Sequence, residues 1–287
     1  MNNGILAQTQ LPVSMPYGLL GDPAPVPLID RAYSYDSDAA SYIRRVESAD
    51  GAPLELAVRV AINNFVLGCK QDGIWTAIKA SCILAGARTL TGALVPLVGT
   101  APTSFNFVDA NYNRKTGLLG DGTTKYLNSN RSDGASPQNS NHICVYVSTA
   151  HNYDGFPIYL GTVNANDPFN GIHIGRNGIN GQLFTRNNSG TFNLFGTGSQ
   201  VGVVGTSRPS SSSADVRSTG VTTSYATTST SPHNINVLIF ANLRTNGSVA
   251  QYSNGRLAFY SIGDAINLGR LDAHVTALYG AIGAAIS

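Results

Sequence analysis

The chain has 287 residues, long enough to bury a full hydrophobic core, so disorder throughout is not expected. Only 12% of the residues are charged, about half the usual ~25% share, and the formal net charge is +2. The four lysines are scattered, so no basic stripe can neutralise phosphates, and nucleic acid is not expected as a partner.

Three cysteines in a chain of this length are too few for a disulfide framework, which favours a reduced, intracellular origin. We interpret Cys69 and Cys82 as buried thiols, and a disulfide between them is the alternative. The N-terminus has neither a basic segment nor an apolar run typical of a signal peptide, so Sec export is not expected. No apolar stretch reaches the ~20 residues of a membrane-spanning helix, so we expect no membrane insertion.

Residues 1–34 form a proline-rich segment in which apolar residues lie between the prolines. Proline at this density prevents both a helix and a central strand. Two interpretations are open: a flexible tail, or an extended arm that docks on a neighbouring subunit. The apolar residues favour the arm, because disordered tails are normally poor in them.

Residues 35–89 predict a helical block of three short helices. The first carries apolar residues at helical spacing from Ala39 to Val46, behind an N-cap at Asp36 or Ser37. The second extends from Leu56 to Gly68, and we expect a third from about Gly73 to Leu84.

The sequence pattern of residues 90–287 predicts an all-β domain, because short runs rich in β-branched and aromatic residues alternate with Gly and Asn. Asn-Gly and Asp-Gly pairs between the runs can supply the positive φ of tight turns. The Ser/Thr-rich residues 207–231 predict polar edge strands and a long loop. The runs that we predict as strands are Phe105 to Val108, His142 to Ser148, Pro157 to Gly161, Gly171 to Arg176, Gln182 to Arg186 and Asn234 to Ala241.

A C-terminal amphipathic helix is predicted over residues 265–287, because apolar residues recur there at alternating spacings of three and four. This seam has two interpretations, packing on the chain's own sandwich or self-association around a symmetry axis. The candidate oligomerisation residues on the seam are Leu268, Leu271, Val275, Leu278 and Ile282.

Three stretches of the later chain carry a resemblance because they follow one another in a fixed order: GLLGDGTTKYL at 117–127, ICVYVS at 143–148 and NGRLAFYSIG at 254–263. Together they resemble a laminin-G-like, concanavalin A-like domain. The resemblance implies a mainly β fold, an antiparallel jelly-roll sandwich over residues 90–287, preceded by the arm and the helical block. The segment 36–84 resembles the one that precedes such domains in tailed-bacteriophage virion proteins.

The resemblance implies a phage virion structural protein, made in the host cytoplasm and located in the virion. We expect a tail-fibre or tail-associated component that assembles through its N-terminal region with other virion proteins and with copies of itself, as a symmetric homo-oligomer, with a trimer as one form. A capsid decoration protein that stabilises the head is the alternative. A glycan-degrading enzyme is the least favoured, because related sandwiches use paired glutamates and this chain has only Glu47 and Glu55. We therefore predict that the protein is not an enzyme, and we name no catalytic residues.

One stretch mixes aromatic rings with side-chain amides, which is the chemistry that binds the flat faces and hydroxyls of sugars. It predicts contact with a cell-surface glycan, and an ordinary core with polar turns is the alternative. The candidate glycan-binding residues are Tyr153, Phe156, Tyr159, Asn164, Asn166 and Phe169.

No cofactor is expected, and calcium is the one candidate ion. Domains of the resembled kind often bind calcium through loop Asp and Asn oxygens, which makes Asp109, Asp121, Asn164, Asn166 and Asp167 candidates. The favoured interpretation of these residues is turn stabilisation through Asx hydrogen bonds.

Overall fold

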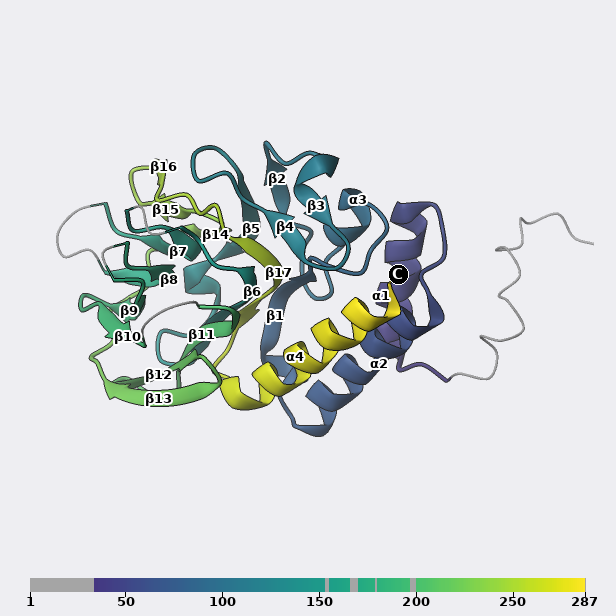
Figure 1. The fold of residues 1–287 in the computed structure, drawn as a ribbon. Helices are drawn as coiled ribbons and strands as arrows, with labels where there is room; N and C mark the ends of the chain where they lie inside the picture. Colours follow the sequence, from purple (N-terminus) through teal and green to yellow (C-terminus); the bar gives the residue numbers. More distant parts are fainter. Residues whose placement is uncertain (1–33, 153–154, 166–169, 179, 197–199, 287) are drawn as a thin grey trace, which may run out of the picture. The chain divides into compact units, whose positions relative to one another are not determined.

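Two helices open the described part of the chain (Figure 1). The first, α1 (Ser37–Asp50), begins after Asp36, whose side chain accepts a hydrogen bond from the backbone N–H of Asp38. It ends at Gly51, which has a φ of 65°. The second, α2 (Leu56–Gln71), lies where the apolar spacing predicts it. The computed structural model describes residues 34–152, 155–165, 170–178, 180–196 and 200–286.

An eight-stranded sheet carries the helices on one of its faces. Its order is β13, β12, β11, β6, β17, β4 and β3; β4 pairs with the first residues of β17 and β1 with the last. The pairs are antiparallel. The strands are β1 (Ile78–Ile83), β3 (Tyr112–Asn113), β4 (Gly117–Leu119), β6 (Asn141–Thr149), β11 (Gly202–Arg208), β12 (Ser213–Ser218), β13 (Val221–Ala226) and β17 (Arg256–Gly263).

A nine-stranded sheet lies on the other side of the sandwich, in the order β10, β9, β8, β7, β14, β5 and β2. In addition, β15 pairs in parallel with β7, and β16 pairs with β15. The strands are β2 (Thr103–Phe105), β5 (Tyr126–Ser132), β7 (Ile158–Val163), β8 (Gly171–Arg176), β9 (Leu183–Ser189), β10 (Asn193–Phe195), β14 (Asn236–Ile239), β15 (Asn242–Arg244) and β16 (Val249–Ala250). Short helical segments also occur at η2 (Trp75–Ala77), α3 (Leu90–Ala93), η3 (Asp109–Asn111) and η4 (Asp133–Ala135).

The main core fills the space between the two sheets. Ile172 and Ile174 of the nine-stranded sheet and Val145 and Val147 of the eight-stranded sheet belong to one buried cluster, because alternate residues of a strand point to the same face. The predicted fold class is confirmed: the chain is mainly β, with two largely antiparallel sheets forming a sandwich, a few helices and a C-terminal helix.

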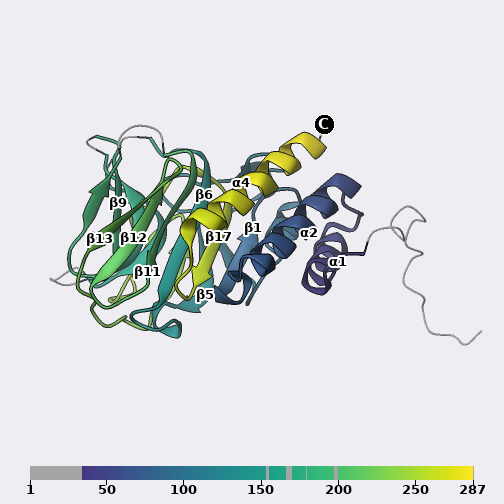
Figure 2. The same cartoon turned by 90° about the horizontal axis from the view of Figure 1, so that it is seen from below.

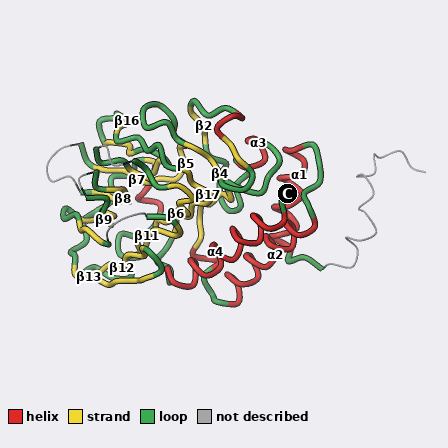
Figure 3. Tube along the Cα trace, in the orientation of Figure 1, coloured by secondary structure: helices red, strands yellow, loops and turns green. Residues whose placement is uncertain are grey.

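A second core lies on the outer face of the eight-stranded sheet. There α1, α2 and α4 (Leu268–Ala285) pack against outward-facing side chains such as Tyr146, Val203 and Phe259. Figure 2 shows α4 and α2 beside β17, and Figure 3 shows these helices grouped on one side of the strands. Among the described residues, no helix has both the length and the apolarity needed to cross a membrane.

The third helix predicted from Gly73 to Leu84 is wrong. Residues 78–83 form β1, which pairs with β17 from Ile78 opposite Gly263 to Ile83 opposite Phe259. Apolar residues stand at 78, 80, 82 and 83, which fits a helical spacing as well as an alternating one, and the pairing with β17 decides between them. Residues 35–287 form one compact unit, so the expected boundary between residues 89 and 90 does not separate two domains.

The candidate oligomerisation residues pack within their own chain, which corrects their assignment to a free seam. The five side chains are at most 4% exposed and lie in the second core, between the sheet and α2. The apolar spacing of the helix is therefore explained by the alternative of packing on its own sandwich.

Several other predictions agree with the described strands. The Ser/Thr-rich stretch supplies β12 and β13 at one edge of the eight-stranded sheet, and the predicted strand from Gly171 to Arg176 coincides with β8. Phe105 is instead the last residue of β2, and Asn106 follows it with a φ of 63°. The predicted arm lies outside the described residues, apart from residue 34.

Candidate functional site

The outer face of the nine-stranded sheet carries a hollow, with His173 of β8 in its lining. Ile172 and Ile174 of β8 point into the main core, so His173 and Gly175 point outward. Gly161 of β7 pairs with His173, and a Cβ at Gly161 would collide with the Cβ of His173. The glycine at position 161 therefore lets His173 lie directly over β7.

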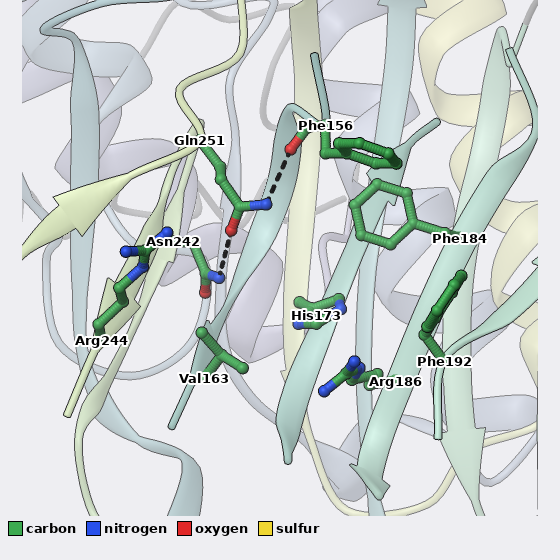
Figure 4. Close-up of a pocket in the computed structure, with 9 residues that line it drawn as sticks. All are labelled: Phe156, Val163, His173, Phe184, Arg186, Phe192, Asn242, Arg244 and Gln251. Atoms are coloured by element: carbon green, nitrogen blue, oxygen red, sulfur yellow. Dashed lines mark hydrogen bonds between the residues drawn. The ribbon is translucent and has the colours of Figure 1, made fainter. Parts of the chain in front are cut away.

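This hollow, which we call the outer-sheet pocket, has a volume of about 420 Å³. In Figure 4, phenylalanine rings gather on one side of it, the amides and Arg244 lie on the other, His173 lies between them, and Arg186 lies near Phe192. The lining residues are Phe156, Val163, His173, Phe184, Arg186, Phe192, Asn242, Arg244 and Gln251.

The aromatic side of the pocket is partly open to solvent. The rings of Phe156 and Phe184 meet edge to face, with centroids 6.0 Å apart, and Phe184 contacts His173 in the same way at 5.5 Å. Phe184 is buried, whereas Phe156 is 46% and Phe192 51% exposed. The two exposed rings therefore offer apolar surface that a ligand can cover.

Two amides form the opposite side. The Nδ2 of Asn242 donates to the Oε1 of Gln251 at 3.0 Å, and the Nε2 of Gln251 donates to the carbonyl of Phe156 at 3.2 Å (Figure 4). Gln251 has a φ of 56°, and its carbonyl accepts from the N–H of Ile158, which holds the residue in this conformation. The Oδ1 of Asn242 is buried and has no hydrogen-bond partner among the described residues.

His173 forms a neutral floor for the pocket. Burial, together with the positive charge of Arg186, lowers its pKa to about 3. A neutral imidazole carries one N–H donor and one acceptor nitrogen. Its Nδ1 is buried and has no hydrogen-bond partner in the described part of the chain, so the ring has hydrogen-bonding capacity that the fold itself does not use.

Two arginines complete the lining. Arg186 of β9 lies directly opposite His173 of β8, and its guanidinium carbon is 5.7 Å from the centroid of the Phe192 ring. Arg244 is the last residue of β15 and lies opposite Val163 of β7. The described lining residues include no Asp or Glu.

The predicted glycan-binding residues are only partly brought together here. Phe156 lines the pocket. The prediction that Tyr159 binds a glycan is wrong. This residue is fully buried in the main core, and its hydroxyl accepts from the N–H of His151, so it offers no surface to a ligand. Asn164 is not among the lining residues, and its Oδ1 accepts from the Thr245 hydroxyl at 3.0 Å. The other three candidates, Tyr153, Asn166 and Phe169, lie outside the described residues.

The calcium candidates that the structure describes, Asp109, Asp121 and Asn164, do not line this pocket. Asp121 stabilises a turn: it accepts from the backbone N–H groups of Thr123, Thr124 and Lys125. Partial burial acts to raise its pKa, but these hydrogen bonds and that of the Thr124 hydroxyl hold the pKa well below its usual range. Asp109 begins η3, and Asn166 and Asp167 lie outside the described residues. Within the described ranges, no three His, Cys, Asp or Glu side chains are grouped to hold a metal ion.

Most of the lining was not predicted from the sequence. Side chains alternate along a strand, so within residues 171–176 His173 faces the side opposite to Arg176 and the two isoleucines. This alternation could have marked His173 as outward-facing. No local signal connects Arg244 or Gln251 with residues about 80 positions earlier, because their proximity depends on the parallel pairing of β15 with β7.

Neither a protein-family model nor a curated protein sequence matches the chain. Among solved structures, it is similar to Trypanosoma rangeli sialidase, with 10% identity and a TM-score of 0.46, over 70% of this chain and 33% of the sialidase. It is also similar to domain 4 of AbnA, an extracellular arabinanase from Geobacillus stearothermophilus (15% identity, TM-score 0.37, 62% and 82% covered). A third similar structure is the enzymatically active domain of tailspike protein 2 of bacteriophage CBA120 (11% identity, TM-score 0.37, 63% and 29% covered).

The prediction that the protein is not an enzyme is contradicted by these comparisons, because sialidases and other glycoside hydrolases are among the similar structures. The chain spans about a third of the sialidase's length. The likeness is one of fold, and it transfers neither a substrate nor a catalytic residue to this chain.

Proposed function

We propose that the protein contacts a glycan through the outer-sheet pocket. The observation that carries the proposal is that two exposed phenylalanines and two buried, unpartnered polar atoms belong to described residues lining one hollow. A sugar has an apolar C–H face and hydroxyls around its rim, so it can cover the rings and hydrogen-bond the polar atoms together.

The two polar atoms favour a sugar over a purely apolar ligand. A buried polar atom without a partner costs about 1–3 kcal/mol, and native proteins keep few of them. A hydroxyl can donate to the Oδ1 of Asn242 and can either donate to or accept from the imidazole of His173. A hydrocarbon would leave both atoms unpaired in a still drier pocket.

A glycan array probed with the wild-type chain, followed by calorimetry with the saccharides that bind, tests this proposal. We expect Phe192→Ala to weaken binding about tenfold, which corresponds to about 1.4 kcal/mol of lost contact. The matched control is Phe105→Ala, because Phe105 on β2 is 37% exposed and does not line the pocket. The proposal is contradicted by a folded wild-type chain that retains no saccharide, or by equal losses in both variants.

We further infer that this contact serves a virion, with the chain as a tail-fibre or tail-associated structural component. The support is the resemblance of residues 36–84 to the segment that precedes laminin-G-like domains in tailed-phage virion proteins. The low charge suits a surface that packs against other subunits, since few ions need to be desolvated. Assembly with other virion proteins and as a symmetric homo-oligomer, with a trimer as one form, belongs to the same proposal. Antibody labelling of purified particles, viewed by electron microscopy, tests it, and unlabelled particles would count against it.

A further inference from the structure

The charge of the outer-sheet pocket is one-sided. Its described lining contains two arginines and no carboxylate. Arg244 pairs with no acid among the described residues, whereas Arg114 pairs with Glu55 at 2.7 Å and Arg217 with Asp272 at 2.7 Å. A hollow whose described lining brings positive charge and no carboxylate favours a ligand that carries negative charge.

Arg244 is held at the pocket by its backbone. Its N–H donates to the carbonyl of Ser248 at 2.9 Å, and its carbonyl accepts from the N–H of Gly247 at 2.8 Å, which closes the turn between β15 and β16. Its pairing with Val163 places it beside β7. The side chain is half-buried, and its guanidinium makes no hydrogen bond or ion pair with a described residue. The fold therefore fixes the backbone of Arg244 and leaves its guanidinium N–H donors available to a ligand.

Arg186 adds positive charge from the other side of His173 (Figure 4). It pairs across the strands with His173, and its guanidinium lies near the Phe192 ring, so its charge is close to the aromatic side of the pocket. The floor between the two arginines is the neutral imidazole of His173, which adds no competing charge of either sign.

We propose that the sugar bound in the outer-sheet pocket carries a carboxylate and that Arg244 binds this carboxylate. The inference rests on the proposed function and names the class of ligand, an acidic sugar. A guanidinium presents parallel N–H donors that match the two oxygens of a carboxylate. The sugar ring then covers Phe156 and Phe192, and its hydroxyls meet Asn242 and His173.

Calorimetry with two pairs of probes tests the inference. The first pair is trigalacturonic acid and its methyl ester, which differ only in whether the carboxylates are free. The second is 3′-sialyllactose and lactose, which separates a sialic acid from a uronic acid as the source of the carboxylate. We expect at least one acid to bind about tenfold more tightly than its neutral partner, with a preference that shrinks as salt is raised.

Variants assign that preference to one side chain. Arg244→Gln should abolish the preference for the acid over its neutral partner, and Arg244→Lys should retain part of it. The matched control is Arg44→Gln, because Arg44 is an exposed arginine on α1 and does not line the pocket. Circular dichroism checks that each variant is folded.

The outcomes separate the two proposals. Equal affinity for acid and neutral partner, with binding still weakened by Phe192→Ala, overturns the acidic-sugar inference and leaves the glycan pocket standing. A preference for the acid that survives Arg244→Gln overturns the role of Arg244. No binding of any saccharide in the array or in these titrations overturns the proposed function, and the inference with it.

Discussion

At the scale of single residues, the buried polar groups of this protein are of two kinds. Arg208 is fully buried, yet its guanidinium donates to the carbonyls of Asn187, Ser210 and Thr227. Such a group is satisfied by the fold and stabilises it. His173 and Asn242 are just as buried but keep an atom without a partner among the described residues. Other buried atoms without a partner among the described residues, such as the Oγ of Ser81, lie away from the pocket, so it is their place in its lining that assigns His173 and Asn242 to ligand binding.

His142 is a satisfied buried histidine, and it makes stability depend on pH. Its Nδ1 lies 2.5 Å from the carbonyl oxygen of Asp264, and its Nε2 lies 2.8 Å from the Ser261 hydroxyl. Burial lowers its pKa to about 4, although the carbonyl of Asp264 acts in the opposite direction. The unfolded chain, with a pKa near 6.5, therefore binds the proton first.

We expect the free energy of unfolding to fall as pH drops from about 6.5 through 4, by roughly 3 kcal/mol from His142 alone. The sign follows from the lowered pKa: the stabilisation is complete above the unfolded value and is lost toward the folded one. Urea denaturation at a series of pH values measures it. His142→Gln should flatten this acid limb, and a limb as steep as that of the wild type would contradict the assignment.

At the scale of elements, α4 illustrates how packing replaces helix propensity. Asn267 caps its first turn by accepting from the N–H of Arg270, and its apolar seam lies in the second core. Gly280 and Gly283 weaken the helix by itself. The ring of His274 lies against Gly68 of α2, where a Cβ would meet it at 2.5 Å, so the two helices approach closely. Tertiary contact thus holds α4 in place.

Leu271→Ala should lower the free energy of unfolding by about 2–5 kcal/mol, because the side chain is fully buried in the second core. Leu56→Ala is the matched control: Leu56 on α2 is 38% exposed and should cost less than about 1 kcal/mol. Denaturant titration gives both values, and light scattering of the same samples gives the oligomeric state. If Leu271→Ala changed only the oligomeric state, the packing that we describe for this residue would be wrong.

At the scale of the whole molecule, residues 35–287 share one structural centre. The eight-stranded sheet has the main core on one face and the helical core on the other, and β1 continues directly from the helical segment into pairing with β17. Both cores include side chains of the eight-stranded sheet, so neither core can form without it. The helices are therefore part of the folding unit of the sandwich, while the outer-sheet pocket occupies the face that these helices do not cover.

We expect one cooperative unfolding transition for this unit. Trp75 is the only tryptophan of the chain, and its indole N–H donates to Asp38 of α1, so its fluorescence reports on the helical side. Circular dichroism near 215 nm reports on the strands. The two thermal curves should have the same midpoint, and two separate midpoints would show that the helices and the sandwich fold independently.

The sequence by itself determined the elements whose signals are local. Residues 36–71 have a helical apolar period, and residues 171–176 alternate, so α1, α2 and β8 were predictable. The sandwich followed from many short β runs separated by turn residues. Residues 78–83 were predicted wrongly, because their apolar positions fit both a helical and an alternating spacing, and only the pairing with β17 shows that they form a strand.

Only the tertiary structure decided which surfaces face a partner and which face the core. The apolar seam of α4 is compatible with either outcome, and it is the neighbouring sheet that covers it. Tyr159 has the composition of a binding residue but points into the main core, whereas His173 lies outward on the strand beside it. The pocket joins residues from Phe156 to Gln251. Their proximity comes from strand pairing across the chain, and pairing over such distances leaves no periodic trace in the sequence.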